Sequence, residues 1–307
     1  MVPPTSRRVF LLMGGAAAVT AAGAARRGGL PSAGRRESAV PAATSSASTE
    51  LLTASVPHTT PSPSPTSTAA ARRTTSSIKE YLTDRPGKGS VAALDLVTAH
   101  SVTYRGTREF ITASIVKVDI LIALLFAAQK DGRSLTRSEK SLTRSMITRS
   151  DNDAASTLWN TIGGARGLNR VNARLGLTGT HAGTGGYWGH TRTTASDQLR
   201  LLRVLAGSTS SLTRARRSYA LDLMRDVVAD QRWGVSAIAA DTKAAALKNG
   251  WLASATDDGL WTVHSIGRVV PANGNPVLLA VLTCGSPNRK TGIATVQQLA
   301  RLAVGGL

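Results

Sequence analysis

The chain of 307 residues contains one cysteine and few aromatic side chains. Because an intramolecular disulfide needs two cysteines, no such bond can stabilise the fold. Cys284 lies in the apolar run 277–284, so we expect a buried thiol that behaves as a small hydrophobic side chain. Phe, Trp and Tyr make up 4% of the residues, and the sequence has no helix-turn-helix, zinc-finger or aromatic RNA-binding motif. We therefore expect no nucleic acid partner.

Acidic residues are also scarce, with 18 Asp and Glu against 37 Lys and Arg and a formal net charge of +19. The first 77 residues hold only eight of the arginines and two of the glutamates, so most of the positive charge belongs to the rest of the chain. Such a charge favours contact with an anionic surface, and an anionic cell-wall polymer is a candidate partner. The alternative is that the charge serves solubility alone.

The first 30 residues predict export. Ser6-Arg7-Arg8-Val9-Phe10-Leu11 precedes a stretch rich in Ala and Gly that is short for a membrane span, and this pattern resembles a twin-arginine signal peptide. Ala22-Gly23-Ala24 supplies small residues for cleavage, and no cysteine lies nearby to carry a lipid anchor. We expect a secreted or extracytoplasmic protein, tethered to the membrane if the signal is not cleaved.

Residues 31–77 are dominated by Ser, Thr, Ala and Pro and have no apolar periodicity. Such a segment cannot bury enough apolar surface to offset the entropy of ordering it, so we predict a disordered stalk. The folded domain is then expected over 78–307, which is long enough for one sizeable core.

The predicted domain begins and ends with strands. Residues 91–97 and 102–104 are β-prone runs that predict an opening hairpin. The run 114–130 is apolar on nearly all sides, as in a buried helix, and 138–207 predict helices joined by loops, one of them capped at Thr194. Strand patterns cover 246–252, 261–270 and 277–283, before a closing helix over 293–304. This order favours an α/β fold of the α+β type, with one antiparallel sheet and a helical insertion.

Three short motifs follow one another along this domain: Ser114-Ile115-Val116-Lys117, Ser150-Asp151-Asn152 and Lys248-Asn249-Gly250. At 100° per residue, Ser114 and Lys117 lie about 60° apart on one helix face. A serine needs a nearby base to become a nucleophile, and a lysine can be that base when burial and a second cation lower its pKa. The motifs predict Ser114 as an acylating nucleophile at a helix N-terminus, Lys117 as its base and Lys248 as the second cation.

Two of these motifs have a second match. Ser76-Ser77-Ile78-Lys79 repeats the first spacing, but it lies at the end of the predicted stalk and not on a buried helix. Lys290-Thr291-Gly292 follows a predicted turn and leads into the last helix, so no strand follows it to line a pocket. Position therefore favours Ser114 and Lys248 over these alternatives.

With these residues, the domain resembles the class A β-lactamases and penicillin-binding proteins of actinobacterial type, whose third motif is Lys-Thr-Gly. Further similarity lies in Thr112-Ala113, Thr191-Arg192-Thr193-Thr194-Ala195 and Gln231-Arg232-Trp233-Gly234. The resemblance implies a five-stranded antiparallel sheet flanked by helices, a trimmed helical lobe, and a site between them. It also implies a serine hydrolase that forms an acyl-enzyme and needs no metal or cofactor.

The second motif has two interpretations. As a helix cap it would have only a structural role. As a catalytic motif of the family, Ser150 would pass a proton to the leaving nitrogen, Asn152 would hold the acyl amide of the substrate, and Asp151 would point away and brace the loop.

The resemblance implies substrate-binding roles for the third motif. Lys248 would bind the substrate carboxylate, and Asn249 would take the place of the usual hydroxyl residue. Gly250 would let the substrate approach and pair with the strand. The backbone N–H groups of Ser114 and Trp251 would form the oxyanion hole.

One part of the family pattern is missing. Class A enzymes use a loop glutamate to direct water onto the acyl-enzyme, whereas residues 154–196 contain no Asp or Glu. The loop 176–192 offers His181, Tyr187 and His190, each of which is a substitute base or a surface residue. We therefore expect slow deacylation.

Three functions stay open for a chain that we expect to be a monomer. The first is acylation and hydrolysis of β-lactams or related small amides, and the second is a D-Ala-D-Ala peptidase or esterase acting on peptidoglycan. The third is a non-catalytic module that keeps the pocket for binding.

Overall fold

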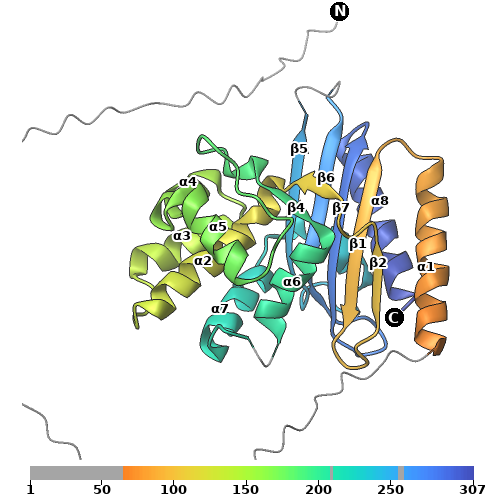
Figure 1. The fold of residues 1–307 in the computed structure, drawn as a ribbon, viewed down its shortest axis with the longest axis horizontal. Helices are drawn as coiled ribbons and strands as arrows, with labels where there is room; N and C mark the ends of the chain where they lie inside the picture. The colour runs from red at the N-terminus through yellow and green to blue at the C-terminus, as the bar shows by residue number, and fades with distance from the viewer. Residues whose placement is uncertain (1–64, 208–209, 255–258) are drawn as a thin grey trace, which may run out of the picture. The chain divides into compact units, whose positions relative to one another are not determined.

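The computed structural model describes residues 65–207, 210–254 and 259–307 (Figure 1). The predicted signal peptide and residues 31–64 of the predicted stalk lie outside these residues. Helix α1, Pro65–Thr83, covers the last part of the predicted stalk. Ala71 of this helix packs against the same buried cluster as Ile78, together with residues of α8, Arg289–Val304.

The centre of the domain is the expected five-stranded antiparallel sheet. Strands β1 and β2 form the predicted hairpin, and the last three strands agree with the predicted ones to within three residues at each end. In spatial order the strands are β2 (Ser101–Tyr104), β1 (Lys88–Asp95), β7 (Val277–Ser286), β6 (Trp261–Val269) and β5 (Ala246–Ala253). Strand β5 therefore lies at an edge, where its outer backbone groups have no neighbouring strand.

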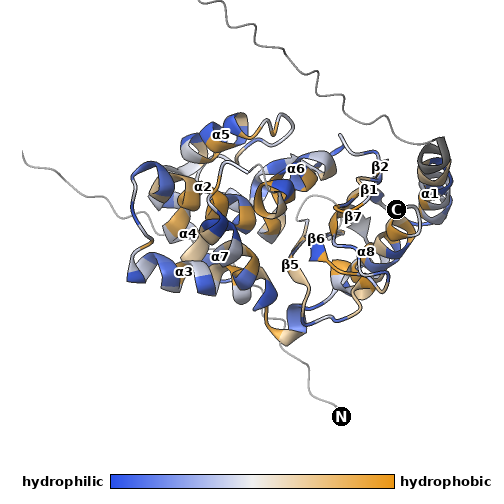
Figure 2. Ribbon diagram, turned by 90° about the horizontal axis from the view of Figure 1, so that it is seen from below, coloured by the Kyte–Doolittle hydropathy of each residue, from blue (hydrophilic) through white to orange (hydrophobic). Residues whose placement is uncertain are grey.

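Both faces of the sheet are buried, which explains why its central strand is a continuous apolar run. Alternate residues of β7 point to opposite faces: Leu278, Ala280 and Leu282 join the core around α2, and Val277, Leu279 and Val281 join the core beneath α8. Figure 2 shows hydrophobic residues both on α2 and on α8, the helices that contribute to these two cores. Cys284 is partly buried rather than buried as expected, because β7 ends two residues later.

The helical insertion is built around α2, Val116–Lys130, in which almost every residue is buried. One of its neighbours, α7, falls in a region for which the sequence predicted no helix. The helices packed against α2 are α3 (Arg137–Thr148), α4 (Asn152–Thr161), α5 (Gly164–Arg174) and α7 (Arg214–Arg225), while α6 (Ala195–Ala206) lies on the sheet. Thr194 caps α6 as predicted, since its side chain accepts a hydrogen bond from the backbone of Asp197 at 3.1 Å.

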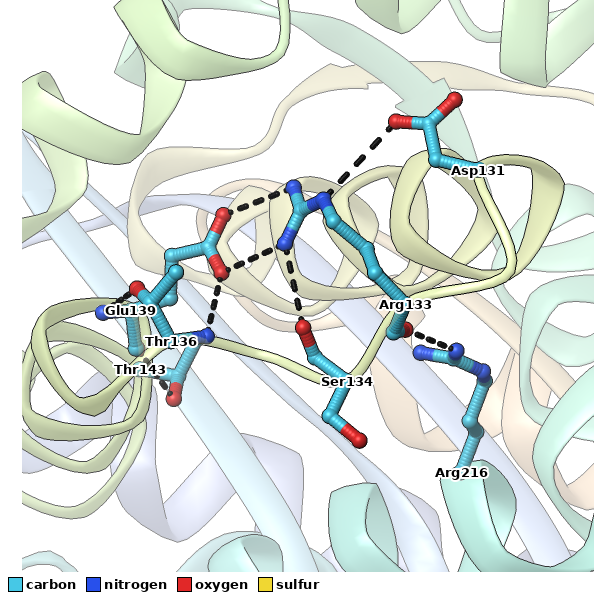
Figure 3. Close-up of polar contacts among 7 residues, drawn as sticks. All are labelled: Asp131, Arg133, Ser134, Thr136, Glu139, Thr143 and Arg216. Atoms are coloured by element: carbon cyan, nitrogen blue, oxygen red, sulfur yellow. Dashed lines mark hydrogen bonds and ion pairs between the residues drawn. The ribbon is translucent and has the colours of Figure 1, made fainter.

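A polar cluster fixes the turn between α2 and α3 (Figure 3). Thr136 and Glu139 form a capping box at the start of α3. Arg133 donates two hydrogen bonds to the Glu139 carboxylate, at 2.9 and 3.0 Å, and Arg216 of α7 donates to the Arg133 carbonyl oxygen at 2.7 Å. The hydrogen bonds from Arg133 lower the pKa of Glu139. This cluster fixes the start of the helix that leads to Ser150.

A two-stranded sheet, which the sequence did not predict, joins two distant loops. Strand β3, Glu109–Ile111, pairs with β4, Arg192–Thr194. The fully buried His264 of β6 anchors β3, because its Nδ1 accepts from the backbone of Thr283 at 3.1 Å and its Nε2 lies 2.7 Å from the Ile111 carbonyl oxygen. Since Nδ1 accepts, Nε2 carries the proton, and burial lowers the pKa of His264 to about 4.

Asp119 is a buried carboxyl group on α2, two residues beyond Lys117. Its Oδ1 accepts a 3.4 Å hydrogen bond from Gln198 of α6, and within the described chain its Oδ2 has no partner. Burial raises the pKa of Asp119 to about 7, because desolvation disfavours the charged form.

This burial makes the free energy of unfolding depend on pH. The pKa of Asp119 is higher in the folded chain, at about 7, than in an unfolded one, so stability falls as the pH rises from about 4 towards 7, by about 1.4 kcal/mol per pKa unit. Asp119→Asn removes this charge. We expect the free energy of unfolding of the variant, measured with urea, to increase relative to that of the wild type as the pH is raised from 5 to 8. An equal pH dependence in both proteins would contradict a buried, protonated Asp119.

Candidate active site

The three sequence motifs meet at one hydroxyl group. Lys117 Nζ on α2 and Lys248 Nζ on β5 each lie 3.1 Å from Ser150 Oγ, in the turn between α3 and α4. Residues far apart in the sequence are thus joined at one point, as the order of the motifs predicted. The catalytic roles of these residues stay predictions.

Ser114 lies in the 3₁₀ turn Ala113–Ile115, just before α2 begins at Val116, and not in the α-helix itself as expected. Ala113 has a φ of 46°, a backbone conformation that is strained for a residue with a side chain. Ser114 is partly exposed, and among the described residues its hydroxyl has no hydrogen-bond partner. Among the described residues the Ser114 hydroxyl is therefore unengaged, and the Ser114 backbone lies against Gly250, two residues along β5 from Lys248.

Lys117 is fully buried and makes its hydrogen bonds to the second motif rather than to Ser114. Its Nζ lies 2.6 Å from the Ser150 carbonyl oxygen and 2.8 Å from Asn152 Oδ1, besides its contact with Ser150 Oγ. Burial lowers the pKa of Lys117 to about 7, although the carboxylate of Asp151 acts in the opposite direction. A neutral amine, which can accept a proton, is thus well populated at neutral pH.

Lys248 is also fully buried, and its Nζ donates to the carbonyl oxygen of Asn249 at 2.9 Å. Burial and the charge of Lys117 lower the pKa of Lys248. Two ammonium groups on one hydroxyl repel each other, so the arrangement favours a state in which one of the two lysines is neutral.

In the second motif, Asp151 forms a helix cap, and the Ser150 hydroxyl contacts the two lysines. Asp151 caps α4, because its Oδ1 accepts from the backbone N–H groups of Asp153 and Ala154, at 2.9 and 3.0 Å. Its Oδ2 accepts from Ser145 at 2.7 Å, so Asp151 braces the turn as predicted. Ser150 has a φ of 60°, and this turn directs its hydroxyl towards the two lysines.

The sequence placed Asn249 at the position of the usual hydroxyl residue, and its substrate-binding role stays a prediction. Consecutive residues of a strand point to opposite faces, so Asn249 faces away from the side that carries Lys248. Its Nδ2 donates to the carbonyl oxygens of Gln231 and Trp233, at 2.7 and 3.2 Å. Asn249 therefore holds the segment before β5 and does not face the two amines.

Trp251 has its side chain on that same far face. Its ring lies 5.7 Å from the ring of Trp233 and 4.2 Å from the guanidinium of Arg289. Only its backbone can belong to the site, and the predicted oxyanion hole of the Ser114 and Trp251 N–H groups stays a prediction.

Gly250 lies against the backbone of the nucleophile turn. A Cβ atom there would come within 2.9 Å of the nitrogens of Ser114 and Ile115 and of the Thr112 carbonyl oxygen. Any side chain would push β5 away from Ser114. Glycine is required here by the protein's own backbone, whereas the sequence argument invoked a close approach of substrate.

The two alternative motif matches lie on the opposite side of the sheet. Ser76 and Lys79 are exposed on α1, and Lys290 is exposed in the first turn of α8. Both helices pack beneath the face that turns away from Lys248. The alternative matches therefore lie apart from Lys117, Ser150 and Lys248, and the choice of Ser114 and Lys248 stays a prediction.

The loop before β4 supplies a residue that the sequence argument missed. Lys117 Nζ lies over the ring of Trp188, 4.9 Å from its centroid. Of the three suggested bases, His181 is exposed, and Tyr187, which is 65% exposed, stacks on His190 at 5.7 Å. Trp188 lies between Tyr187 and His190, which the sequence argument did name. The only signal for Trp188 in the sequence is an apolar ring in a polar, Gly-rich loop.

No group of three His, Cys, Asp or Glu side chains within the described chain is arranged to bind a metal ion.

Solved structures of known proteins share this fold. The extended-spectrum β-lactamase TLA-1 superposes with a TM-score of 0.68 at 18% identity, over 76% of this chain and 97% of that one. The protein PBP-A gives a TM-score of 0.64 at 21% identity, over 75% and 94% of the two chains. At such identities the likeness establishes the fold alone.

Sequence comparisons extend the likeness. "Putative lipoprotein LppW" of Mycobacterium tuberculosis is 26% identical over 219 residues, which span 69% of this chain and 68% of that protein. A family model described as the Beta-lactamase enzyme family matches residues 73–140 and 138–307. Together with the fold and with the meeting of the three motifs, this match shows that the chain belongs to the Beta-lactamase enzyme family.

Proposed function

We propose that the protein is a serine hydrolase that β-lactams or related amides acylate at Ser114. The observation that carries the proposal is the contact of two buried lysine amines with Ser150 Oγ. Ser114 begins the same motif as Lys117, and among the described residues its hydroxyl has no hydrogen-bond partner. Burial of two amines costs free energy. Such an arrangement is typical of active sites, where burial lowers the pKa of a catalytic group. The family and the fold support a hydrolase of the β-lactamase and penicillin-binding-protein superfamily.

In this mechanism Ser114 Oγ attacks the carbonyl carbon of the amide, and its proton passes to the neutral amine of Lys117. Ser150 then gives its proton to the leaving nitrogen as the C–N bond breaks, and Lys117 returns a proton to Ser150 Oγ over the observed 3.1 Å contact. The products are an ester on Ser114 and a neutral amine. The backbone N–H groups of Ser114 and Trp251 would stabilise the oxyanion.

Substrate binding follows from the remaining contacts. When Lys117 is the neutral amine, a protonated Lys248 would attract a substrate carboxylate. Asn152 uses its Oδ1 for Lys117, which leaves its Nδ2 to donate to the acyl amide. With Asn249 turned away, Lys248 lacks the neighbouring side chain that would share the carboxylate, so we infer that carboxylate recognition is weaker than in the family pattern.

Deacylation is the slow step in our proposal. Residues 154–196 contain no carboxylate, and the three suggested bases of the loop are exposed or directed at one another. A slowly hydrolysed ester favours a second candidate function, a D-Ala-D-Ala peptidase or esterase of the cell wall, for which β-lactams act as inhibitors. Release of D-Ala from muropeptide stem peptides, with negligible β-lactam turnover, would favour this candidate.

We also propose that the protein acts outside the cytoplasm. The N-terminal Arg7-Arg8 pattern supports export, and a relative described as a lipoprotein supports the same location. The net charge of +19 would favour contact with an anionic cell-wall polymer. Within the described residues, no helix combines the length and the hydropathy needed to cross a membrane.

The acylation claim is tested by intact-mass spectrometry after incubation with penicillin. We expect the wild type to gain one covalent adduct, because the Ser114 hydroxyl is unengaged, and Ser114→Ala to gain none. Ser76→Ala is the matched control, since it removes the serine of the second Ser-x-x-Lys match, and it should react like the wild type. A wild type without adduct would leave only the non-catalytic binding module.

The role of Lys117 predicts a pH dependence. Its neutral amine must accept the Ser114 proton, and its pKa is about 7. The acylation rate should therefore rise about tenfold from pH 5 to 6 and level off above about pH 8. Stopped-flow rates with a chromogenic cephalosporin measure this profile. A rate that is flat from pH 5 to 8 would exclude Lys117 as the base.

A further inference from the structure

Trp188 covers the amine of Lys117 from the side of the loop that carries no carboxylate. It begins the short 3₁₀ helix η2, Trp188–His190, and its side chain is half-buried. Lys117 Nζ also donates hydrogen bonds to three oxygen atoms, which belong to Ser150 and Asn152. The indole ring is thus an apolar contact of an amine whose hydrogen-bond partners are all oxygens.

The position of this ring is fixed from two directions. Trp188 Nε1 donates to Ser156 Oγ of α4 at 3.1 Å. The following residues are fastened to Thr112, whose backbone N–H donates to the Thr191 carbonyl oxygen at 2.7 Å and whose Oγ1 donates to that of Gly189 at 3.3 Å. Since Thr112 stands two residues before Ser114, the ring and the nucleophile are held by the same segment.

An ester on Ser114 would need water and a base to be hydrolysed. Water would attack the ester carbon and give a proton to Lys117 Nζ, the bond to Ser114 Oγ would break, and Lys117 would return the proton to that oxygen. The reaction needs no other partner, so access of water to Lys117 decides its rate. An apolar ring next to Lys117 Nζ would exclude water from the position that the attacking molecule needs.

We propose that Trp188 excludes water from Lys117 in the acyl-enzyme and so protects the ester on Ser114 from hydrolysis. The inference rests on the proposed acylation of Ser114. It makes Trp188 a positioning residue that acts through Lys117, and it explains the slow deacylation by a side chain that is present as well as by the missing carboxylate.

The test is the lifetime of the penicillin adduct, followed by intact-mass spectrometry after excess penicillin has been removed. Trp188→Ala opens the space beside Lys117, and we expect the adduct to decay about tenfold faster or more. In this variant the decay rate should rise with pH as Lys117 loses its proton, a signature that mere loosening of the loop would not produce. Trp188→Phe keeps a ring over the amine and should retain most of the lifetime.

The control is Tyr81→Ala on α1, which removes a ring that also faces a cation, Arg85, at 3.7 Å, but lies on the other side of the sheet. Its adduct should decay like that of the wild type. An unchanged lifetime in Trp188→Ala would overturn the inference and leave the acylation proposal intact, and failure of Trp188→Ala to acylate would overturn it as well. Absence of an adduct on the wild type would overturn both.

Discussion

The site depends on one hydroxyl group that two buried lysine amines share. Both ammonium groups cannot remain charged at this distance without a large energetic penalty, because among the described residues neither has a carboxylate in direct contact. One amine is therefore kept neutral near physiological pH, and a neutral lysine is a base. The hydroxyl of Ser150 connects this base to the second amine, so that a proton can move between them.

The backbone around the site fixes the turn that carries Ser114. The nucleophile turn is wedged between β5, where Gly250 allows the closest approach, and the loop that ends at β4. The buried His264 ties the same segment to the centre of the sheet. Strain at Ala113 is thus held in place by the sheet on one side and by the loop on the other.

Much of this could be predicted from the sequence. The strands could be predicted because central strands that are buried on both faces are continuous apolar runs. The positions of the motifs along the chain favoured Ser114 and Lys248 over the alternative matches at Ser76 and Lys290. The hydrogen bonds of Asn249 to Gln231 and Trp233 could not be predicted, because the motif alone does not show which backbone groups lie beside β5. Helix α1 was taken for the end of a stalk, since only its packing beneath α8 distinguishes it from the Ser- and Thr-rich segment before it. Trp188 belongs to no periodic pattern in the sequence, and only its contact with Lys117 in the folded chain identifies it as part of the site.

The claim that one of the two amines is neutral near pH 7 is tested most directly by titrating the lysine side chains. NMR of the full chain with ¹³C-labelled lysine monitors this titration. We expect one lysine Cε resonance to titrate with a midpoint of about 7 and to be absent from the spectrum of Lys117→Gln. Lysine resonances that all remain those of charged ammonium groups up to about pH 10 would contradict the account.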